Sequence, residues 1–447
     1  MKVNRILIYS LLLAGITITS CKDDNPSIDD YWLNYEIEEV KVTQDIPVGV
    51  YLYNPQNALE TNVDQWTRIT EEQDVAAGKL GPNTKPWYDL PEALEAGKYH
   101  LAADTIGARA MQKIIEWCHY GRIDFMVLPG INENANDIYP LNIGRDTAFI
   151  DMVRGLNDTL PKVELNGVKF ALMVNMNSMC SDLNNNKLVE NVDPTRKTYP
   201  VIETIPDINN PGMDIVVTTR VDTLIKRSDR ICSYFKRISD YFSDPNYYHT
   251  GGRPVVVIAD ANKLYTQDSY RMYTAIRDTV RKHTGKEMYL IAQQGAWTPP
   301  ERFHYFYLSG KVDAVTMKNM CAVGGAQYER VILFDQFVNE NYKYNKEVFW
   351  SRYNIDFIPS ASPGYSQYVA TENNSNYPWM PKTQERFWTM CNVAKMNLGT
   401  NPMVLIDSFN DWAFDSCIEP TDPSYGKGYG LLYLDMVKDQ FKTCWRN

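Results

Sequence analysis

The sequence predicts one α/β domain, a (β/α)₈ barrel of the TIM type with long loop insertions at its strand ends. Two observations carry this prediction: short apolar runs recur eight times along the chain, and helical periodicity fills many of the stretches between them. The runs are nearly continuous rather than alternating, as in strands that a parallel sheet buries on both faces. Eightfold alternation is typical of a closed barrel, although an open doubly wound sheet would produce it too.

The predicted strands share this apolar character. They are Val48–Tyr53, Ile123–Pro129, Phe170–Met176, Pro254–Asp260, Met288–Gln294, Val312–Met317, Asp356–Ser360 and Met403–Phe409. Before the third strand, Asn166-Gly167 between Val163–Leu165 and Val168–Ala171 predicts a two-residue hairpin turn.

The predicted helices show apolar residues at helical spacing or end at a glycine. They are Asp104–Tyr120, Val221–Phe242, Ser269–His283, Gln384–Leu398 and Leu431–Phe441. The first and third stop at Gly121 and Gly285, and Val221–Phe242 carries its apolar residues on one stripe.

Two insertions account for the length beyond the roughly 250 residues of a simple barrel. Asn54–Gly97 and Asp182–Thr219 both follow predicted strands, where barrel active sites are built, and we expect both to be loops. Asp182, Asn184 and Asn186 have the oxygen spacing of a calcium loop. Lys187 stands where such a loop needs glycine, so we expect a solvated loop and no metal.

The N-terminus predicts an export signal over residues 1–20. Lys2 and Arg5 precede an apolar run, Ile6–Ile18, that is too short to span a bilayer. The tetrapeptide ending at Cys21 resembles a bacterial lipobox, which implies a lipid on Cys21 and an outer-membrane address; a plain signal peptide is the alternative. Residues 21–45 have the composition of a flexible tether, which leaves 46–447 for the barrel.

An acidic cluster directly follows that cysteine. Asp23, Asp24, Asp29 and Asp30 resemble the surface-export signal of Bacteroidetes lipoproteins, which implies that the protein faces the cell exterior. The cluster is equally compatible with a plain solvated tether.

Composition excludes several classes of partner and cofactor. Lys and Arg number 45 against 55 Asp and Glu, for a net charge of −10, and no basic stripe is present, so nucleic acid is not expected as a partner. The 8 cysteines form no CxxC or Cys/His cluster, so we expect no zinc site and no cofactor. Tyr (30) is twice as frequent as Phe (15), and polar-tipped rings suit a sugar-binding surface.

Polar residues at the carboxyl ends of the predicted strands are the candidate ligand contacts. They include Tyr51, Tyr53, Asn54, Asn175, Asp260, Gln293 and Tyr365, with Trp66 in the first insertion. The end of the eighth strand is richest, because four carboxylates and Trp412 fall between Asp407 and Pro420. Carboxylates beside an aromatic ring suit glycoside hydrolysis, which needs a proton donor and a nucleophile or base. Capping of the next helix or binding of a structural cation is the plainer alternative.

The same segment resembles a known family signature. Asn410-Asp411-Trp412, Ile418-Glu419-Pro420 and Tyr425-Gly426 are similar to the Asn-Glu-Trp-x-Glu-Gly…Ile-Glu-Pro…Tyr-Gly pattern of family-99 glycoside hydrolases, the endo-α-mannosidases, and their WbsX-like relatives. Shorter similarities occur in the first strand, before the first helix and in the fourth strand. The resemblance implies a barrel acting on α-mannosides, in which one Glu deprotonates the substrate 2-hydroxyl, giving retention through a sugar epoxide, and a second Glu is the acid/base.

The chain departs from that pattern at the acid/base. Asp411 stands where the first Glu would be, whereas Phe414 stands where the acid/base Glu would be, and a phenyl ring cannot transfer a proton. Asp260 or Asp415 would have to supply it, so the catalytic candidates are Asp411, Asp415 and Asp260. Trp412 and Glu419 join the candidate substrate contacts.

Three functions follow as hypotheses. The first is hydrolysis of α-mannoside-type or related glycans at a cell surface, impaired by the loss of the acid/base Glu. The second is a non-catalytic glycan-binding lipoprotein that presents polysaccharide to uptake partners. The third is a scaffold barrel with a protein partner.

Overall fold

The computed structural model describes residues 35–53, 63–88, 101–129, 143–207, 209–294, 304–308, 310, 312–323, 333–371 and 380–443. Nine strands form one sheet in the order β10-β9-β8-β7-β3-β2-β1-β12-β11, and each pairs in parallel with its neighbours. The strands are β1 (Val48–Tyr51), β2 (Phe125–Pro129), β3 (Lys169–Asn175), β7 (Arg253–Ala259), β8 (Tyr289–Gln294), β9 (Ala314–Met317), β10 (Asp356–Ile358), β11 (Ser360–Ala361) and β12 (Val404–Ile406). Each of the eight predicted strands overlaps at least one of them, and the short β6 (His249–Thr250) pairs antiparallel with β7.

The two ends of this sheet meet at one residue. β10 pairs with β9, β11 pairs with β12, and only Pro359 separates β10 from β11. Proline has no N–H to donate to a ladder, so the pairing changes partner there, while the Pro359 carbonyl accepts from the Leu405 N–H at 3.1 Å. β10 and β11 therefore act as one interrupted strand that brings the sheet round into the predicted barrel.

The strands bury both faces. In β7, Val255 and Val257 belong to the cluster inside the barrel, whereas Val256 and Ile258 belong to the cluster under the helices. Gly49 in β1 makes room for the interior, since a Cβ there would lie 2.3 Å from the Phe125 ring. Burial on both faces explains why the strands are continuous apolar runs in the sequence.

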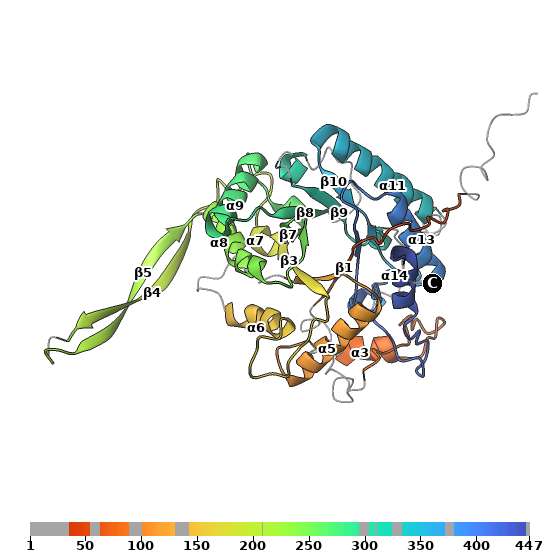
Figure 1. Ribbon diagram of the computed structural model, residues 1–447, viewed down its shortest axis with the longest axis horizontal. Coiled ribbons are helices and arrows are strands. Elements are labelled where there is room, and N and C mark those ends of the chain that lie inside the picture. Colours follow the sequence, from red (N-terminus) through yellow and green to blue (C-terminus); the bar gives the residue numbers. More distant parts are fainter. Residues whose placement is uncertain are drawn as a thin grey trace, which may run out of the picture.

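Helices surround the barrel (Figure 1). They are α3 (Val63–Thr70), α5 (Thr105–Tyr120), α6 (Ile143–Val153), α7 (Met176–Cys180), α8 (Arg227–Ile238), α9 (Ser269–Thr284), α11 (Phe334–Val348), α12 (Tyr368–Thr371), α13 (Gln384–Met396) and α14 (Leu432–Phe441). Short 3₁₀ turns lie at Ser239–Ser243, Ala261–Lys263, Met320–Val323 and Trp412–Phe414, and π turns at His304–Leu308 and Phe349–Tyr353.

Local signals explain where the predicted helices begin and end. The Asp104 carboxylate accepts from the Gly107 N–H at 2.8 Å at the start of α5. α9 ends at Gly285 with φ +71°, a left-handed conformation that glycine adopts without strain. Four of the five predicted helices are confirmed as helices over most of their length.

The prediction of a helix over Val221–Phe242 is wrong for its first five residues. Val221–Ile225 belong to β5 (Asp214–Ile225), which pairs antiparallel with β4 (Thr195–Pro206), and α8 begins only at Arg227. The second insertion is thus a long β-hairpin rather than a loop over much of its length. β-branched residues fill the run before Lys226, and their preference for strands outweighs an apolar spacing that a helix would share.

Two smaller expectations concern turns. Asn166 and Gly167 form a tight turn with φ of +49° and +86°, but no strand forms over Val163–Leu165, so the predicted hairpin is absent. The Asp182 carboxylate, in the calcium-like spacing, is bound at 2.8 Å by both Lys187 and Arg227.

The predicted export signal, Cys21 and most of the tether lie outside the described residues. Within the described part of the chain, no helix is both long and apolar enough to cross a membrane. Of the cysteines that the structure describes, Cys232 is partly buried and the others are buried, all as free thiols.

Candidate functional site in the barrel mouth

The loop after β12 is hydrogen-bonded to the end of the neighbouring strand β1. Its Phe409 N–H donates to the Tyr51 carbonyl at 2.9 Å. The Asn410 side-chain amide bonds both the N–H and the carbonyl of Tyr53, each at 2.8 Å. These bonds extend the pairing of β12 and β1 beyond the strands and hold the segment from Asp407 to Phe414 in one conformation.

Asp407 is a buried carboxyl at the start of this loop, and the sequence did not single it out. Its side chain accepts from the Tyr53 hydroxyl at 3.2 Å and from the Asn319 N–H at 2.9 Å, and the residue is only 3% exposed. Burial raises the pKa of Asp407, while the Asn319 N–H, the charge of Lys318 and the Tyr53 hydroxyl oppose that rise. Both oxygens are thus engaged from different strand ends.

Asp411 lies four residues further along, in the loop at the carboxyl end of β12. Its N–H donates to Ser408 Oγ at 2.8 Å, and the residue keeps part of its surface exposed although protein surrounds the carboxyl. Burial first, and the charge of Asp407 second, raise the pKa of Asp411 to about 7, against the backbone N–H groups of Phe414 and Ala413 and the charge of Lys318. A carboxyl with such a pKa can take or give a proton near neutrality.

Two tyrosines belong to the same cluster. The charges of Asp407 and Asp411 both act on Tyr53 and Tyr365, whose pKa values are raised by burial first and by these carboxylates as well. In the case of Tyr365, Gln367 works in the opposite direction. Both phenols therefore stay protonated and available as hydrogen-bond donors at neutral pH.

Phe414 lies face to face with Tyr365. The ring centroids are 5.3 Å apart with an interplanar angle of 7°, and the Ser366 N–H donates to the Phe414 carbonyl at 2.8 Å. Stacked rings offer a flat apolar surface of the kind on which sugar C–H groups pack. The position expected to hold an acid therefore holds half of an aromatic pair.

The other two catalytic candidates are ion-paired. Asp260 follows β7 in a left-handed conformation and accepts from Lys318 Nζ at 3.2 Å. Asp415 also has positive φ, and its partner is the partly buried Lys382, whose Nζ lies 3.3 Å away. Lys318 links Asp260 to the Asp407 and Asp411 cluster, whereas Lys382 holds Asp415 beside Cys417 and Tyr429.

Several predicted substrate contacts are buried. Glu419 is 0% exposed and accepts from Trp412 Nε1 at 2.6 Å and from the Tyr88 hydroxyl, so it holds Trp412 in the core. Trp66 packs in the core from α3. Asn175 caps α7, accepting from the Asn177 N–H at 2.9 Å.

Tyr51 and Gln293 form the layer beneath the mouth. Both are 1% exposed, and their terminal Oη and Nε2 atoms form no hydrogen bond of ordinary geometry in the described chain, although Gln293 is near enough to lower the pKa of Tyr51. Burial still raises that pKa well above its usual value. Asn54, the remaining predicted contact, lies outside the described residues.

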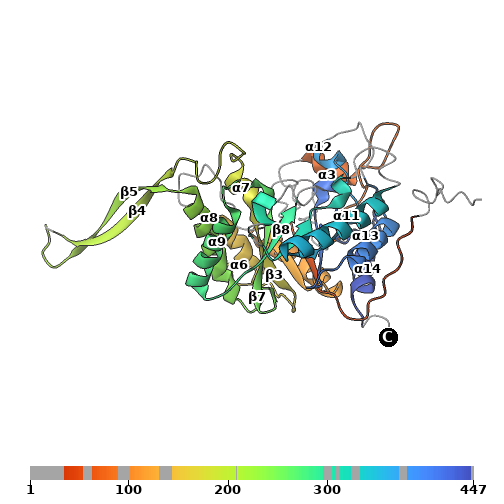
Figure 2. The same cartoon turned by 90° about the horizontal axis from the view of Figure 1, so that it is seen from above.

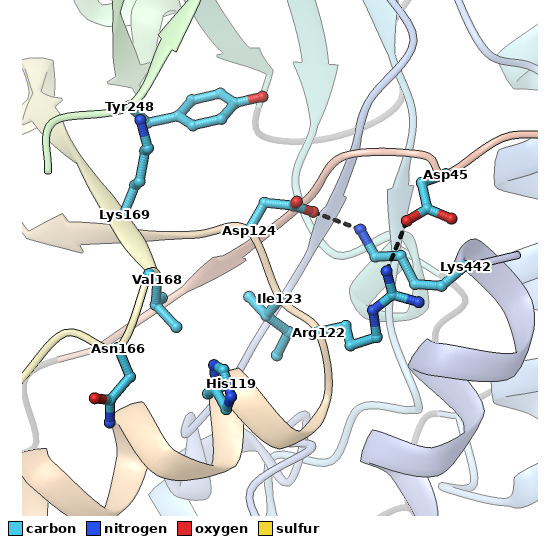
Figure 3. A pocket seen from close by; sticks show the side chains of 11 residues that line it. Asp45, His119, Arg122, Ile123, Asp124, Asn166, Val168, Lys169, Tyr248 and Lys442 are labelled. Atoms are coloured by element: carbon cyan, nitrogen blue, oxygen red, sulfur yellow. Dashed lines mark hydrogen bonds and ion pairs between the residues drawn. The ribbon is translucent and has the colours of Figure 1, made fainter. Parts of the chain in front are cut away.

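A cavity of about 390 Å³ lies at the opposite end of the barrel (Figure 3). Two ion pairs lie in its wall: Arg122 contacts Asp45 at 2.8 Å, and Lys442 Nζ contacts Asp124 at 2.6 Å. Asp124 also accepts from the Val48 N–H at 2.7 Å, so these pairs fasten the chain ends to β1 and β2. Residues at this end of a barrel ordinarily serve stability. Within the described residues, no three His, Cys, Asp or Glu side chains group as metal ligands.

A parallel barrel with carboxyls and aromatic rings at the carboxyl ends of its strands is a glycoside hydrolase-like fold. Residues 222–436 match the family model described as glycosyltransferase WbsX, a span that includes Asp407 and Asp411. The structure is similar over 93% of this chain and 99% of the other to a "Glycoside hydrolase-like protein", with a TM-score of 0.67 and 25% identity.

A second similar structure is the GH99 endo-alpha-mannosidase from Bacteroides thetaiotaomicron, at TM-score 0.50 and 14% identity over 89% of this chain and 97% of the other. At that identity the likeness concerns the fold. A comparison with curated proteins found no match. The chain is therefore similar to the WbsX family model over residues 222–436, and it shares the fold of the family-99 structure.

Proposed function

We propose that the protein hydrolyses α-mannoside-type or related glycans, with Asp411 as the reacting carboxyl. The observation that carries this is the position of Asp411 in the barrel mouth with a pKa raised to about 7 by burial and by the charge of Asp407. A base is most effective when its pKa lies near the working pH. In the reaction that the resemblance to family-99 enzymes implies, Asp411 would take the proton of the sugar 2-hydroxyl.

The proposed reaction lacks an evident proton donor. Asp407 is largely enclosed, with both oxygens engaged, and Asp260 is paired with Lys318. Phe414 has no proton to give. Losing a positioned donor costs about 10²–10⁴-fold in rate, so we expect slow turnover, with Asp260 as the first candidate to replace the donor.

Non-catalytic glycan binding is the second candidate. The parallel stack of Phe414 on Tyr365 favours it, because an aromatic surface replaces the acid. Such a protein would present polysaccharide to uptake partners at the cell surface.

A substrate panel separates the two functions. The chain without its signal peptide would be incubated with α-mannans and complex glycans, and both binding and release of reducing ends would be measured. Hydrolysis is supported if the parent protein releases reducing ends, Asp411→Asn abolishes this release and Asp415→Asn retains it. Saturable binding without release from the parent protein supports the binding function. If the parent protein shows neither binding nor release, both proposals are without support.

We also propose that Cys21 carries a lipid and anchors the protein in the outer membrane, facing outward. The support is the lipobox-like sequence and the acidic cluster after it. Incorporation of labelled fatty acid that Cys21→Ser abolishes would support the anchor, and protease access in intact cells would test the orientation.

A further inference from the structure

A short antiparallel ladder joins the first insertion to the segment that follows β12. Pro86 and Thr421 form its bridge. The Trp87 N–H donates to the Pro420 carbonyl at 3.0 Å. The ladder therefore holds the backbone of Trp87 in one place.

The two faces of this ladder differ. Opposite side chains of an antiparallel pair share a face, and the face alternates from one residue to the next. Pro86 and Thr421 fill the buried face, so Lys85, Trp87 and Asp422 lie on the other one. On that outward face Lys85 Nζ contacts Asp422 Oδ2 at 3.2 Å, and Trp87 is 37% exposed. A flat ring and an ion pair therefore lie side by side on one surface.

Tyr425 adds a second ring to this surface. Lys85 Nζ lies 4.9 Å from the centre of the Tyr425 ring, and the Tyr425 hydroxyl donates to the Thr70 carbonyl at 2.7 Å. Lys85 and Trp87 are two residues apart in an extended segment, which separates their Cα atoms by about 7 Å. The surface thus combines two rings with one ion pair.

Glu419 connects this surface to the candidate site. Its carboxylate accepts from Trp412 Nε1 at 2.6 Å and from the Tyr88 hydroxyl. Trp412 directly follows Asp411, and Tyr88 directly follows Trp87. The exposed ring and the candidate base are therefore adjacent in the chain to two residues that bind one buried carboxylate, which fixes their separation.

The surface lies at the carboxyl end of the barrel. α12 follows β11, and the Arg68 side chain of α3 donates to the Val369 carbonyl of α12 at 2.9 Å. Figure 2 shows the two helices together at one end of the barrel. The segment that leads to Trp87 is bound to α3 in turn, because the Thr84 N–H donates to the Ile69 carbonyl at 3.1 Å. The exposed ring is therefore at the same end of the barrel as the candidate site.

We propose that Trp87, Lys85 and Asp422 form a second glycan subsite, which binds a sugar unit of the same chain whose reacting unit lies at Asp411. This inference rests on the proposed glycan function. A sugar ring offers an apolar face of C–H groups that packs on an indole, and its hydroxyls can bond an ammonium and a carboxylate at once. Contact at two separated places requires a ligand of several sugar units, so the ligand class is an oligosaccharide or polysaccharide.

Chain-length dependence tests the subsite in the full protein. The parent and Trp87→Ala would be titrated with methyl α-mannoside and with α-mannan oligosaccharides of increasing length. Binding of the long oligosaccharides should weaken at least about fivefold in Trp87→Ala, whereas binding of the monosaccharide should stay the same. Trp87→Tyr keeps a flat ring and should retain most of the affinity. Equal affinity of the parent and Trp87→Ala for the long oligosaccharides overturns the subsite.

Trp350→Ala is the matched control. Trp350 is 49% exposed and follows α11, which Figure 1 shows on the other side of the barrel from α3. Removing its indole should leave the oligosaccharide affinity unchanged, and thermal unfolding of both variants checks that each keeps its fold. A loss of affinity that is the same in both variants overturns the proposal, because it would not depend on where the indole lies.

Footprinting of the unsubstituted protein adds a measurement that needs no variant. Hydroxyl-radical labelling of Trp87 should fall when a long oligosaccharide binds, while labelling of Trp350 should not change. Labelling of Trp87 that stays the same in the saturated complex overturns the subsite.

These experiments separate the subsite from the function on which it rests. A parent protein that binds no glycan of any length overturns both. A parent protein that binds or cleaves glycans equally well with and without the Trp87 indole keeps the proposed function and loses the subsite.

Discussion

The charge of Asp407 raises the pKa of Asp411, and the two carboxyls belong to one cluster at the end of a single strand. Tyr53 and Asn319, from two other strand ends, hold Asp407 in place. Asp411 keeps some exposed surface in the mouth, whereas Asp407 is enclosed. Asp407 is thus a positioning group and Asp411 the one that can meet a ligand.

Asp407→Asn should lower the pKa of Asp411 from about 7, because it removes a like charge while keeping the size of the side chain. Burial persists, so the pKa should stay above the ordinary value of about 3.9. Titration of ¹³C-aspartate signals by NMR, with Asp411→Asn to assign the resonance, measures this. Asp415→Asn should leave that titration unchanged, and an unmoved pKa in Asp407→Asn would contradict the relationship.

Asp411 should make stability depend on pH. Its pKa is about 7 folded and about 3.9 unfolded, so between these values the folded state binds more protons and stability falls as pH rises. Above pH 7 the loss is complete, at up to about 4 kcal/mol of unfolding free energy. Asp411→Asn should therefore stabilise the protein more at pH 8 than at pH 4. Urea unfolding at both pH values checks this, and a gain that is equal at both would count against it.

Phe414→Glu should increase turnover. It places a carboxylic acid where the family resemblance puts the acid/base, and a positioned proton donor contributes about 10²–10⁴-fold. Release of reducing sugar from α-mannans is the measurement. Phe414→Gln is the matched control, because it has the same shape as Glu and also breaks the stack on Tyr365 but cannot donate in this way. Equal rates for the two variants would exclude a missing acid as the cause of low activity.

Glu419→Ala should destabilise the fold by about 3–5 kcal/mol. Trp412 Nε1 and the Tyr88 hydroxyl would lose their acceptor in a fully buried place, and a cavity would remain. Thermal or urea unfolding measures the loss. Glu419→Gln keeps one acceptor oxygen and should cost less. A protein that loses glycan binding but keeps its stability would instead place Glu419 among the ligand contacts.

The strands could be predicted because burial on both faces of the sheet requires an uninterrupted apolar run in the sequence. Val255 to Ile258 are apolar without interruption since alternate residues enter two different cores. The β4–β5 hairpin could not be predicted in the same way. Apolar residues in Val221–Ile225 fit helical spacing, and only the pairing with β4 shows that they form a strand.

The candidate site, too, could be predicted only in part from the sequence. The sequence alone identified the segment after the last strand, because four carboxylates and a tryptophan within a few residues are chemically conspicuous. It could not rank them. Glu419 and Asp415 are held by partners far away in the chain, Tyr88 and Lys382. Asp407 acquires its importance from Tyr53 and Asn319, and the pKa of Asp411 depends on burial.

The amino-acid order by itself determined the alternating α/β class, the eight strand runs and the location of the candidate chemistry, since each depends on neighbours along the chain. Only the tertiary structure decided which carboxyl lies in the mouth, which ones are neutralised by partners, and that a long hairpin leaves the barrel. Electrostatic environment and burial depend on groups that folding brings together, and no local pattern encodes them.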